Sequence, residues 1–172
     1  GVGDHLMLGG DNIDLALAHL AESRMNTLTG SEKRFSASDL SQLIEQCRIV
    51  KELLLAKDAP EQATITLLGG GSKIIGGSRS IVFTRDEVKT LALDGFFPLS
   101  KQDDLPEKKR SGVVEFGLPY SSEPAISKHI AAFLKLHLTA SREALKGQGN
   151  VPDALLLNGG VFRSQLITQR LL

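Results

Sequence analysis

The chain has 172 residues, of which 41% are hydrophobic, and its 20 basic side chains are balanced by 20 acidic ones. This length fits one ordinary domain or two small subdomains, and the apolar content fits a globular protein with a hydrophobic core. The balanced charge argues against electrostatic capture of nucleic acid or of an anionic membrane surface. No apolar run approaches the roughly 18 residues that a membrane helix needs, and no signal peptide is visible.

The residue types that bind metals or act as nucleophiles are sparse and scattered. Cys47 is the single cysteine, which excludes a disulfide within the chain and favours a reducing, cytoplasmic setting. Because it lies within a helical pattern, we expect a packed thiol. The four histidines form no cluster with zinc-ligand spacing, and no Ser–His–Asp order supports a hydrolase. We therefore predict no metal site.

The first half of the chain predicts two helices followed by a small group of strands. The predicted elements are a helix at residues 11–22, a helix at 38–56, a strand at 64–67, a glycine turn at 69–72 and one or two strands within 73–84. Because a helical stripe must bury against another element, we expect both helices on one face of the strands. Thr84 and Glu87 have the spacing of a capping box, which predicts a further helix to about Leu93.

The second half predicts a loop-like excursion, a helix and a strand–turn–helix unit. Residues 95–122 contain three prolines and a charged stretch, which indicates a surface insertion. Helical spacing resumes at residues 123–145 and ends at glycines. Residues 154–157 form an unbroken apolar run, typical of a strand buried on both faces of a parallel sheet. Two glycines follow, and then a helix from about Arg163.

The strand–glycine–helix unit at residues 155–164 is the most informative motif. In open α/β sheets, ligands bind beyond the carboxyl ends of strands, and glycines let the backbone approach a flat ligand. Arg163, at the start of the helix, can lay its guanidinium plane over an aromatic base. Gly159 and Gly160 also fit an ordinary tight turn, which taken alone explains them better. A second junction of this kind, at residues 9–10, strengthens the nucleotide hypothesis.

The glycine run at residues 69–71, followed by Ser72 and Lys73, does not fit a phosphate-binding loop. Such a loop needs spaced glycines before Lys-Ser/Thr, between a buried strand and a helix. Here the glycines are contiguous and strand-like sequence follows. We therefore expect a hairpin turn.

Four segments of the chain, at residues 8–14, 47–54, 83–88 and 156–164, show a family resemblance. The first is similar to a Leu-Gly-Gly-Glu-Asp-Phe-Asp segment, and the second to a Cys-Glu-x-Ala-Lys-x-x-Leu-Ser helix. The third resembles a Thr-Arg-x-x-Phe stretch, and the fourth a Leu-Val-Gly-Gly-Ser-Thr-Arg-Ile-Pro adenosine motif. These four family patterns occur, in this order and at about this spacing, in the DnaK-type (seventy-kilodalton heat-shock) chaperones, which the chain therefore resembles.

The resemblance implies an actin-like, ribonuclease H-like ATPase fold. This fold is α/β with an α+β outer subdomain, and the chain covers part of its second lobe. Residues 1–94 are then mainly the outer subdomain, with two helices on a small antiparallel sheet. Residues 95–122 are an insertion loop. Residues 123–172 are part of the inner subdomain and contain the adenosine motif.

The resemblance also implies which residues bind ATP or ADP. Five match family positions near the adenosine: Gly10, Lys51, Gly159, Gly160 and Arg163. Magnesium belongs to the complete family ATPase, and no metal ligand is implied in this chain. The family's phosphate-binding loops, hydrolytic groups and substrate-binding domain have no counterpart in this sequence. No catalytic residue is therefore implied, and we expect the chain alone to be inactive as an ATPase.

Polar contacts of the family are altered at several positions. Arg48 stands where the family has a Glu that hydrogen-bonds the nucleoside, and Leu55 stands where it has a Ser. Val161 replaces the Ser after the glycine pair, and Ser164 follows Arg163 directly, without the family's proline. These differences indicate a divergent, bacterial-type branch. They also favour an alternative, a noncatalytic actin-like scaffold that has lost nucleotide binding.

The function expected from the resemblance is the adenosine-binding part of an ATP-dependent, cytoplasmic chaperone of the stress response. The partners implied with it are unfolded polypeptide clients, co-chaperones and nucleotide-exchange factors, but neither nucleic acid nor membrane. A third class, a sugar or acetate kinase of the same fold superfamily, is disfavoured because the pattern at residues 47–51 is chaperone-like.

Overall fold

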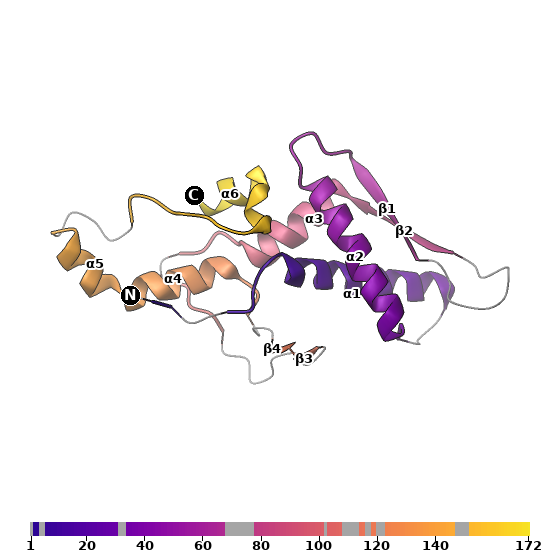
Figure 1. The fold of residues 1–172 in the computed structure, drawn as a ribbon, viewed down its shortest axis with the longest axis horizontal. Helices are drawn as coiled ribbons and strands as arrows, with labels where there is room; N and C mark the ends of the chain where they lie inside the picture. Colours follow the sequence, from indigo (N-terminus) through magenta and orange to yellow (C-terminus); the bar gives the residue numbers. More distant parts are fainter. Residues whose placement is uncertain are drawn as a thin grey trace.

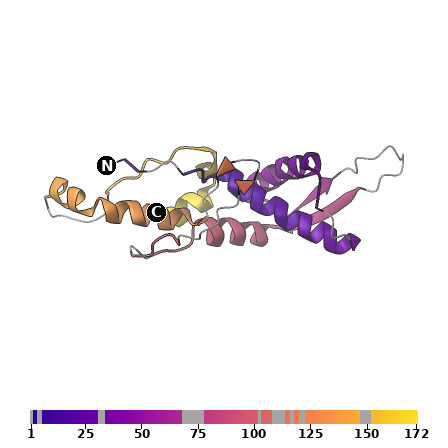
Figure 2. The ribbon, with the colours of Figure 1, turned by 90° about the horizontal axis from the view of Figure 1, so that it is seen from below.

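The computed structural model shows helices and short strands arranged along one long axis (Figure 1, Figure 2). The described residues are 2–3, 6–30, 34–67, 78–101, 103–107, 114–115, 118–119, 123–146 and 152–172. The helices are α1 (Gly10–Thr29), α2 (Ala37–Leu54), α3 (Arg85–Lys89), the π-helix η1 (Thr90–Phe96), α4 (Ile126–Leu136), α5 (Leu138–Ala144), the 3-10 helix η2 (Gly160–Arg163) and α6 (Gln165–Leu171). The strands are β1 (Gln62–Leu67), β2 (Arg79–Thr84), β3 (Val114–Glu115) and β4 (Leu118–Pro119).

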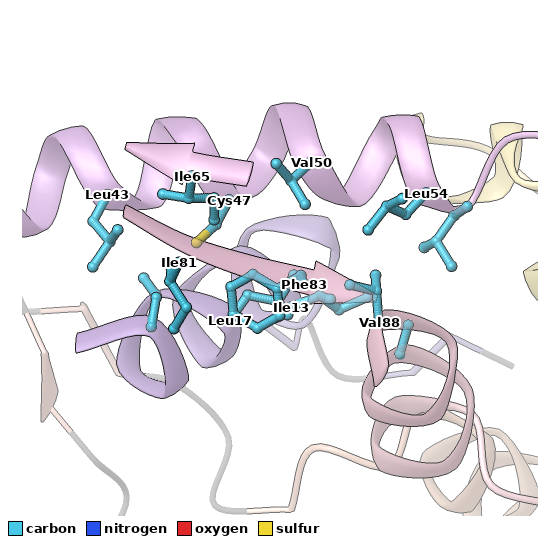
Figure 3. Packing of buried hydrophobic residues seen from close by; sticks show 14 of the residues in the cluster. Ile13, Leu17, Leu43, Cys47, Val50, Leu54, Ile65, Ile81, Phe83 and Val88 are labelled. Carbon is cyan, nitrogen blue, oxygen red and sulfur yellow. The ribbon is translucent and has the colours of Figure 1, made fainter. Parts of the chain in front are cut away.

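Helices α1 and α2 pack on one face of the antiparallel pair β1–β2. Ile65 lies opposite Ile81 in this pair. Because side chains alternate along a strand, Ile81 and Phe83 point to the same face, and both are buried there with Ile65. Figure 3 shows these side chains packed with Cys47 of α2 and Leu17 of α1. This arrangement is the one that the helical stripes predicted.

Capping residues begin the second and third helices. The Ser36 hydroxyl accepts a hydrogen bond from the Asp39 amide at 3.1 Å, and α2 starts directly after it. The predicted capping box is confirmed: the Glu87 carboxylate accepts a hydrogen bond from the Thr84 amide at 2.8 Å, and the Thr84 hydroxyl accepts one from the Glu87 amide at 3.3 Å. The local sequence therefore determines both helix starts.

Helix α1 is longer than the sequence predicted. It continues beyond residue 22 to Thr29, because Ala21 and Met25, four residues apart, extend its buried face. Gly30 ends it with a φ of 64°, a left-handed conformation that favours glycine. Residues 31–33, between α1 and α2, lie outside the described ones, as does the predicted turn at 69–72.

After α3 the chain stays in the core for longer than predicted. Phe96 ends η1, and it and Phe97 are 5% and 1% exposed. Phe97 packs edge-to-face on Phe162, with ring centroids 6.2 Å apart. The first residues of the predicted insertion therefore belong to the core, and the surface excursion starts at Pro98. The short strands β3 and β4 pair with each other within the excursion.

Residues 123–146 lie outside the main core except at Ile126, which packs against it. Helix α4 buries Ala131, and no residue of α5 is buried. Figure 1 shows both helices, in orange, extending away from α1 and α2. The single helix predicted at residues 123–145 is interrupted at His137, whose φ of −101° and ψ of 12° depart from α-helical values.

The prediction of a buried strand at residues 154–157 is wrong in this structure. The segment is irregular, and Leu155 and Leu156 are 45% and 95% exposed. A strand needs a neighbour to satisfy its N–H and C=O groups, and none of the described strands pairs with this segment. Both glycine pairs still lie at the starts of helices, since α1 begins at Gly10 and η2 begins at Gly160. The actin-like fold and the three-part division of the chain stay predictions.

Replacing Phe97 with alanine should lower the free energy of unfolding by about 3–5 kcal/mol, because it opens a cavity in the packed core. Leu99, which is 83% exposed, supplies the control: Leu99→Ala should change that free energy by less than about 0.5 kcal/mol. Urea unfolding followed by circular dichroism measures both. Small effects of both replacements would show that the surface excursion begins before Phe97.

Candidate functional site

A cavity of about 450 Å³ opens where three distant segments of the chain meet. Its walls include Gly10 at the start of α1, Lys51 near the end of α2, and Arg163 of η2. Ile167 of α6 also lines it, is 1% exposed and belongs to the hydrophobic core, so one wall is the packed interior itself. Small-molecule sites typically have volumes of about 300–1,000 Å³, and this cavity lies within that range.

Lys51 and Asp14 form a buried ion pair at the cavity. Nζ of Lys51 lies 2.6 Å from Oδ1 of Asp14, and the two side chains are 8% and 2% exposed. The buried Oδ1 of Asp14 thus has the Lys51 ammonium as its ionic partner. The Lys51 ammonium donates a hydrogen bond to the Gly10 carbonyl at 3.1 Å. One ammonium group therefore joins α2 to the first turn of α1.

Burial determines the protonation behaviour of this region. It raises the pKa of the Asp14 carboxyl above its ordinary value of 3.8, and the Lys51 ammonium opposes only part of that rise. Burial, helped by the Asp14 carboxylate, also raises the pKa of the Cys47 thiol to about 12. A thiol with such a pKa forms almost no thiolate at neutral pH and is unreactive. Cys47 is thus the packed thiol that the helical pattern predicted.

The charges around the cavity are balanced. Three acidic and three basic residues line it: Asp11, Asp14, Glu52, Arg48, Lys51 and Arg163. Arg48 and Glu52 form an ion pair at 3.5 Å, with side chains 56% and 66% exposed. Such exposed pairs contribute about 0–1 kcal/mol, so either side chain can turn toward a ligand at little cost. Arg163 is exposed and makes no ion pair with any residue that the structure describes.

Glycines shape two edges of the cavity. A Cβ at Gly10 would lie 3.1 Å from Nζ of Lys51, so the missing side chain makes room for the ammonium. Gly159 has a φ of 108°, which requires glycine, and it precedes the cavity without lining it. Gly160 has neither constraint: its φ is not left-handed, and a Cβ there would meet no described atom within 4 Å. Because Gly160 has no side chain, its backbone is accessible from the cavity.

A larger groove, of about 760 Å³, lies along α4 and is the weaker candidate. Its lining contains Leu6, Ile130, Phe133 and Leu155 and includes no Asp, Glu, Lys or Arg. Sites for small molecules combine apolar walls with a few polar groups that fix the orientation of the ligand. The smaller cavity has such groups on three sides, and the groove has His129 as its main polar side chain.

The structure brings together four of the five residues predicted to bind ATP or ADP: Gly10, Lys51, Gly160 and Arg163. Gly159 lies next to the cavity and gives the turn its backbone conformation. Sequence reasoning missed Asp14. A signal was present, because Asp14 lies three residues before Leu17 on the buried face of α1, and a charge on an apolar face needs a buried partner.

Lys51→Met should lower the free energy of unfolding by about 3–5 kcal/mol at neutral pH, because it leaves the Asp14 carboxylate buried without its counter-charge. Lys135, paired with Asp103 at 3.1 Å on the surface, offers a matched control: Lys135→Met should cost less than about 1 kcal/mol. Chemical denaturation measures both. If adding Asp14→Asn to Lys51→Met restores none of the loss, lost packing rather than an unpaired charge is the cause.

The raised pKa of Asp14 predicts that the stability of the folded chain depends on pH, and that Asp14→Asn removes this dependence. Because burial raises the folded pKa above 3.8, the folded state binds more protons than the unfolded state between the two values. The stability that Asp14 contributes is therefore fully present below about pH 3.8 and is lost as the pH rises through the folded pKa. The stability of the native chain relative to Asp14→Asn should decline over this window. Parallel pH profiles of the two proteins would contradict the assignment.

No protein-family model, curated protein or solved structure matches this chain. Within the residues that the structure describes, no group of three or more His, Cys, Asp or Glu side chains could hold a metal ion. None of the described helices is long and apolar enough to cross a membrane. Three of the four family-like segments, at residues 8–14, 47–54 and 156–164, contribute residues to the cavity, and the segment at 83–88 does not.

Proposed function

We propose that this chain is the adenosine-binding part of the nucleotide-binding domain of an ATP-dependent chaperone of the DnaK type. The observation that supports the proposal is the convergence of Gly10, Lys51, Gly160 and Arg163 on one cavity of about 450 Å³. These residues come from short motifs near the beginning, in the first third and near the end of the sequence. The motifs alone do not bring these residues into contact, since contacts between distant positions in the sequence depend on the fold.

The chemistry of the cavity suits an uncharged nucleoside better than a phosphate chain. The charges of its three acidic and three basic side chains cancel, so no net positive field attracts a triphosphate. Val161 and Ile167 offer apolar contacts, and the Arg163 guanidinium offers a flat cation for an aromatic ring. The Glu52 carboxylate can accept hydrogen bonds from ribose hydroxyl groups. Adenosine is the nucleoside that ATP and ADP have in common.

Each predicted residue has a distinct role in the proposal. Arg163 stacks on the adenine, and Gly160 lets the base approach the backbone. Lys51 acts by holding Gly10 and Asp14 in place, because its ammonium is already engaged by both. Hydrolysis, magnesium binding and contacts with clients, co-chaperones and exchange factors would belong to other parts of such a chaperone.

A noncatalytic scaffold that does not bind nucleotide is the second candidate. Arg48 and Val161 favour it, because they stand where the DnaK-type motifs have a hydrogen-bonding Glu and Ser. Glu52 weighs against it. Its carboxylate lies one helical turn from Arg48, lines the cavity and is 66% exposed, so an acceptor remains in this region.

Arg163→Ala should weaken the binding of adenosine by about threefold to thirtyfold, because a stacked guanidinium contributes about 0.5–2 kcal/mol. Arg34→Ala is the matched control, since Arg34 is exposed and does not line the cavity. Nuclear magnetic resonance titration of the isotope-labelled chain measures the affinity, and the amides that shift, with those of Gly10 and Gly160 expected among them, locate the ligand.

The same titration with ATP separates a nucleoside site from a phosphate site. ATP should bind the chain within about threefold of adenosine, because the cavity offers its phosphates no net charge. Tighter binding of ATP by tenfold or more would point to a phosphate site instead. If adenosine leaves the unmodified chain unchanged, the scaffold becomes the better explanation. If adenosine binds Arg163→Ala as well as the unmodified chain, Arg163 does not stack on the adenine.

A further inference from the structure

Ser164 occupies the N-cap position of α6 but does not cap it. An N-cap serine ordinarily accepts a hydrogen bond from an amide in the first turn of its helix. Here the side chain makes no such bond. Its Oγ instead donates a hydrogen bond, at 3.1 Å, to the carbonyl of Leu55, 109 residues earlier in the chain. The hydroxyl is thus used for a tertiary contact.

This hydrogen bond joins two walls of the cavity. Leu55 is the C-cap of α2, and its amide donates to the Lys51 carbonyl at 3.0 Å, one helical turn back. Carbonyl groups at a helix end lack partners within the helix, so the Leu55 carbonyl is free to accept from outside. Ser164 follows Arg163 directly, and the Ser164 amide donates to the Val161 carbonyl at 3.4 Å. The Ser164–Leu55 bond therefore connects the turn that contains Arg163 to the helix that contains Lys51.

Other contacts hold α6 and η2 on the core, but they do not involve the Arg163 side chain. Phe162 packs on Phe97, Ile167 is 1% exposed, and Arg170 pairs with Asp94 at 3.0 Å. The Arg163 side chain is exposed and makes no ion pair with a described residue. Its position at the cavity depends on the backbone of the turn, and Ser164 ties this turn to the end of α2 through a hydrogen bond.

We propose that Ser164 is a positioning residue, which sets the place of Arg163 at the cavity through its hydrogen bond to the Leu55 carbonyl. This inference rests on the proposed adenosine site and adds a residue to it. Ser164 acts on the affinity for the nucleoside through Arg163, and not by supplying a ligand contact of its own. Its removal loosens one turn and leaves the hydrophobic core intact.

The test is a double-mutant cycle on the full chain with adenosine as the probe. Ser164→Ala should weaken adenosine binding about threefold to tenfold, a loss of about 0.7–1.4 kcal/mol. Ser164→Thr, which keeps the hydroxyl, should stay within about twofold of the unmodified chain. In the Arg163→Ala background, Ser164→Ala should have no further effect, since residues that act as one unit are not additive. The midpoint of thermal unfolding should fall by no more than about 4 °C.

The outcomes separate this inference from the proposed function. If the unmodified chain does not bind adenosine, both fail together. If it binds and Ser164→Ala binds equally, the role of Ser164 alone fails. A loss that persists in the Arg163→Ala background would assign Ser164 a direct contact with the ligand and would overturn the positioning role. Weak binding by Ser164→Thr, as weak as that of Ser164→Ala, would also overturn it.

Discussion

The contact on which the rest of the structure depends is the ammonium of Lys51, held between the Asp14 carboxylate and the Gly10 carbonyl. Burying two charges costs free energy, and their attraction repays it only when the geometry is good. The Lys51 ammonium is the main charge that compensates the buried Asp14 carboxylate. The pair consequently fixes how the start of α1 approaches the end of α2, and this approach forms one side of the cavity.

The cavity lies at the boundary between the apolar core and these polar groups. Leu54, Ile167 and Ile13 are fully or almost fully buried and hold α2, α6 and α1 together. Because the core excludes water on that side, a flat ligand would meet an apolar wall there and charged side chains at the opening. The exposed charged residues that line the cavity are Asp11, Arg48, Glu52 and Arg163, and the Arg48–Glu52 pair is a weak surface contact.

The third wall of the cavity comes from a segment with little regular structure of its own. Residues 152–159 pair with none of the described strands, and η2 and α6 are short. Short helices gain little stability from propensity and depend on tertiary contacts. Here Phe162 and Ile167 supply the apolar contacts, and Ser164 supplies a polar one to α2. Polar contacts are directional, which is why one hydroxyl can govern the position of a neighbouring side chain.

The sequence alone determined the elements whose signals lie within a few residues: the capping box at Thr84, the alternation along β1 and β2, and the buried stripe of α2. Its motifs also pointed to Lys51 and Arg163, and both line the cavity. Only the tertiary structure decided that Lys51 pairs with Asp14 and that residues 154–157 are exposed rather than buried. Caps and periodicity act through neighbouring backbone groups, whereas an ion pair or a strand partner depends on residues that only folding brings together.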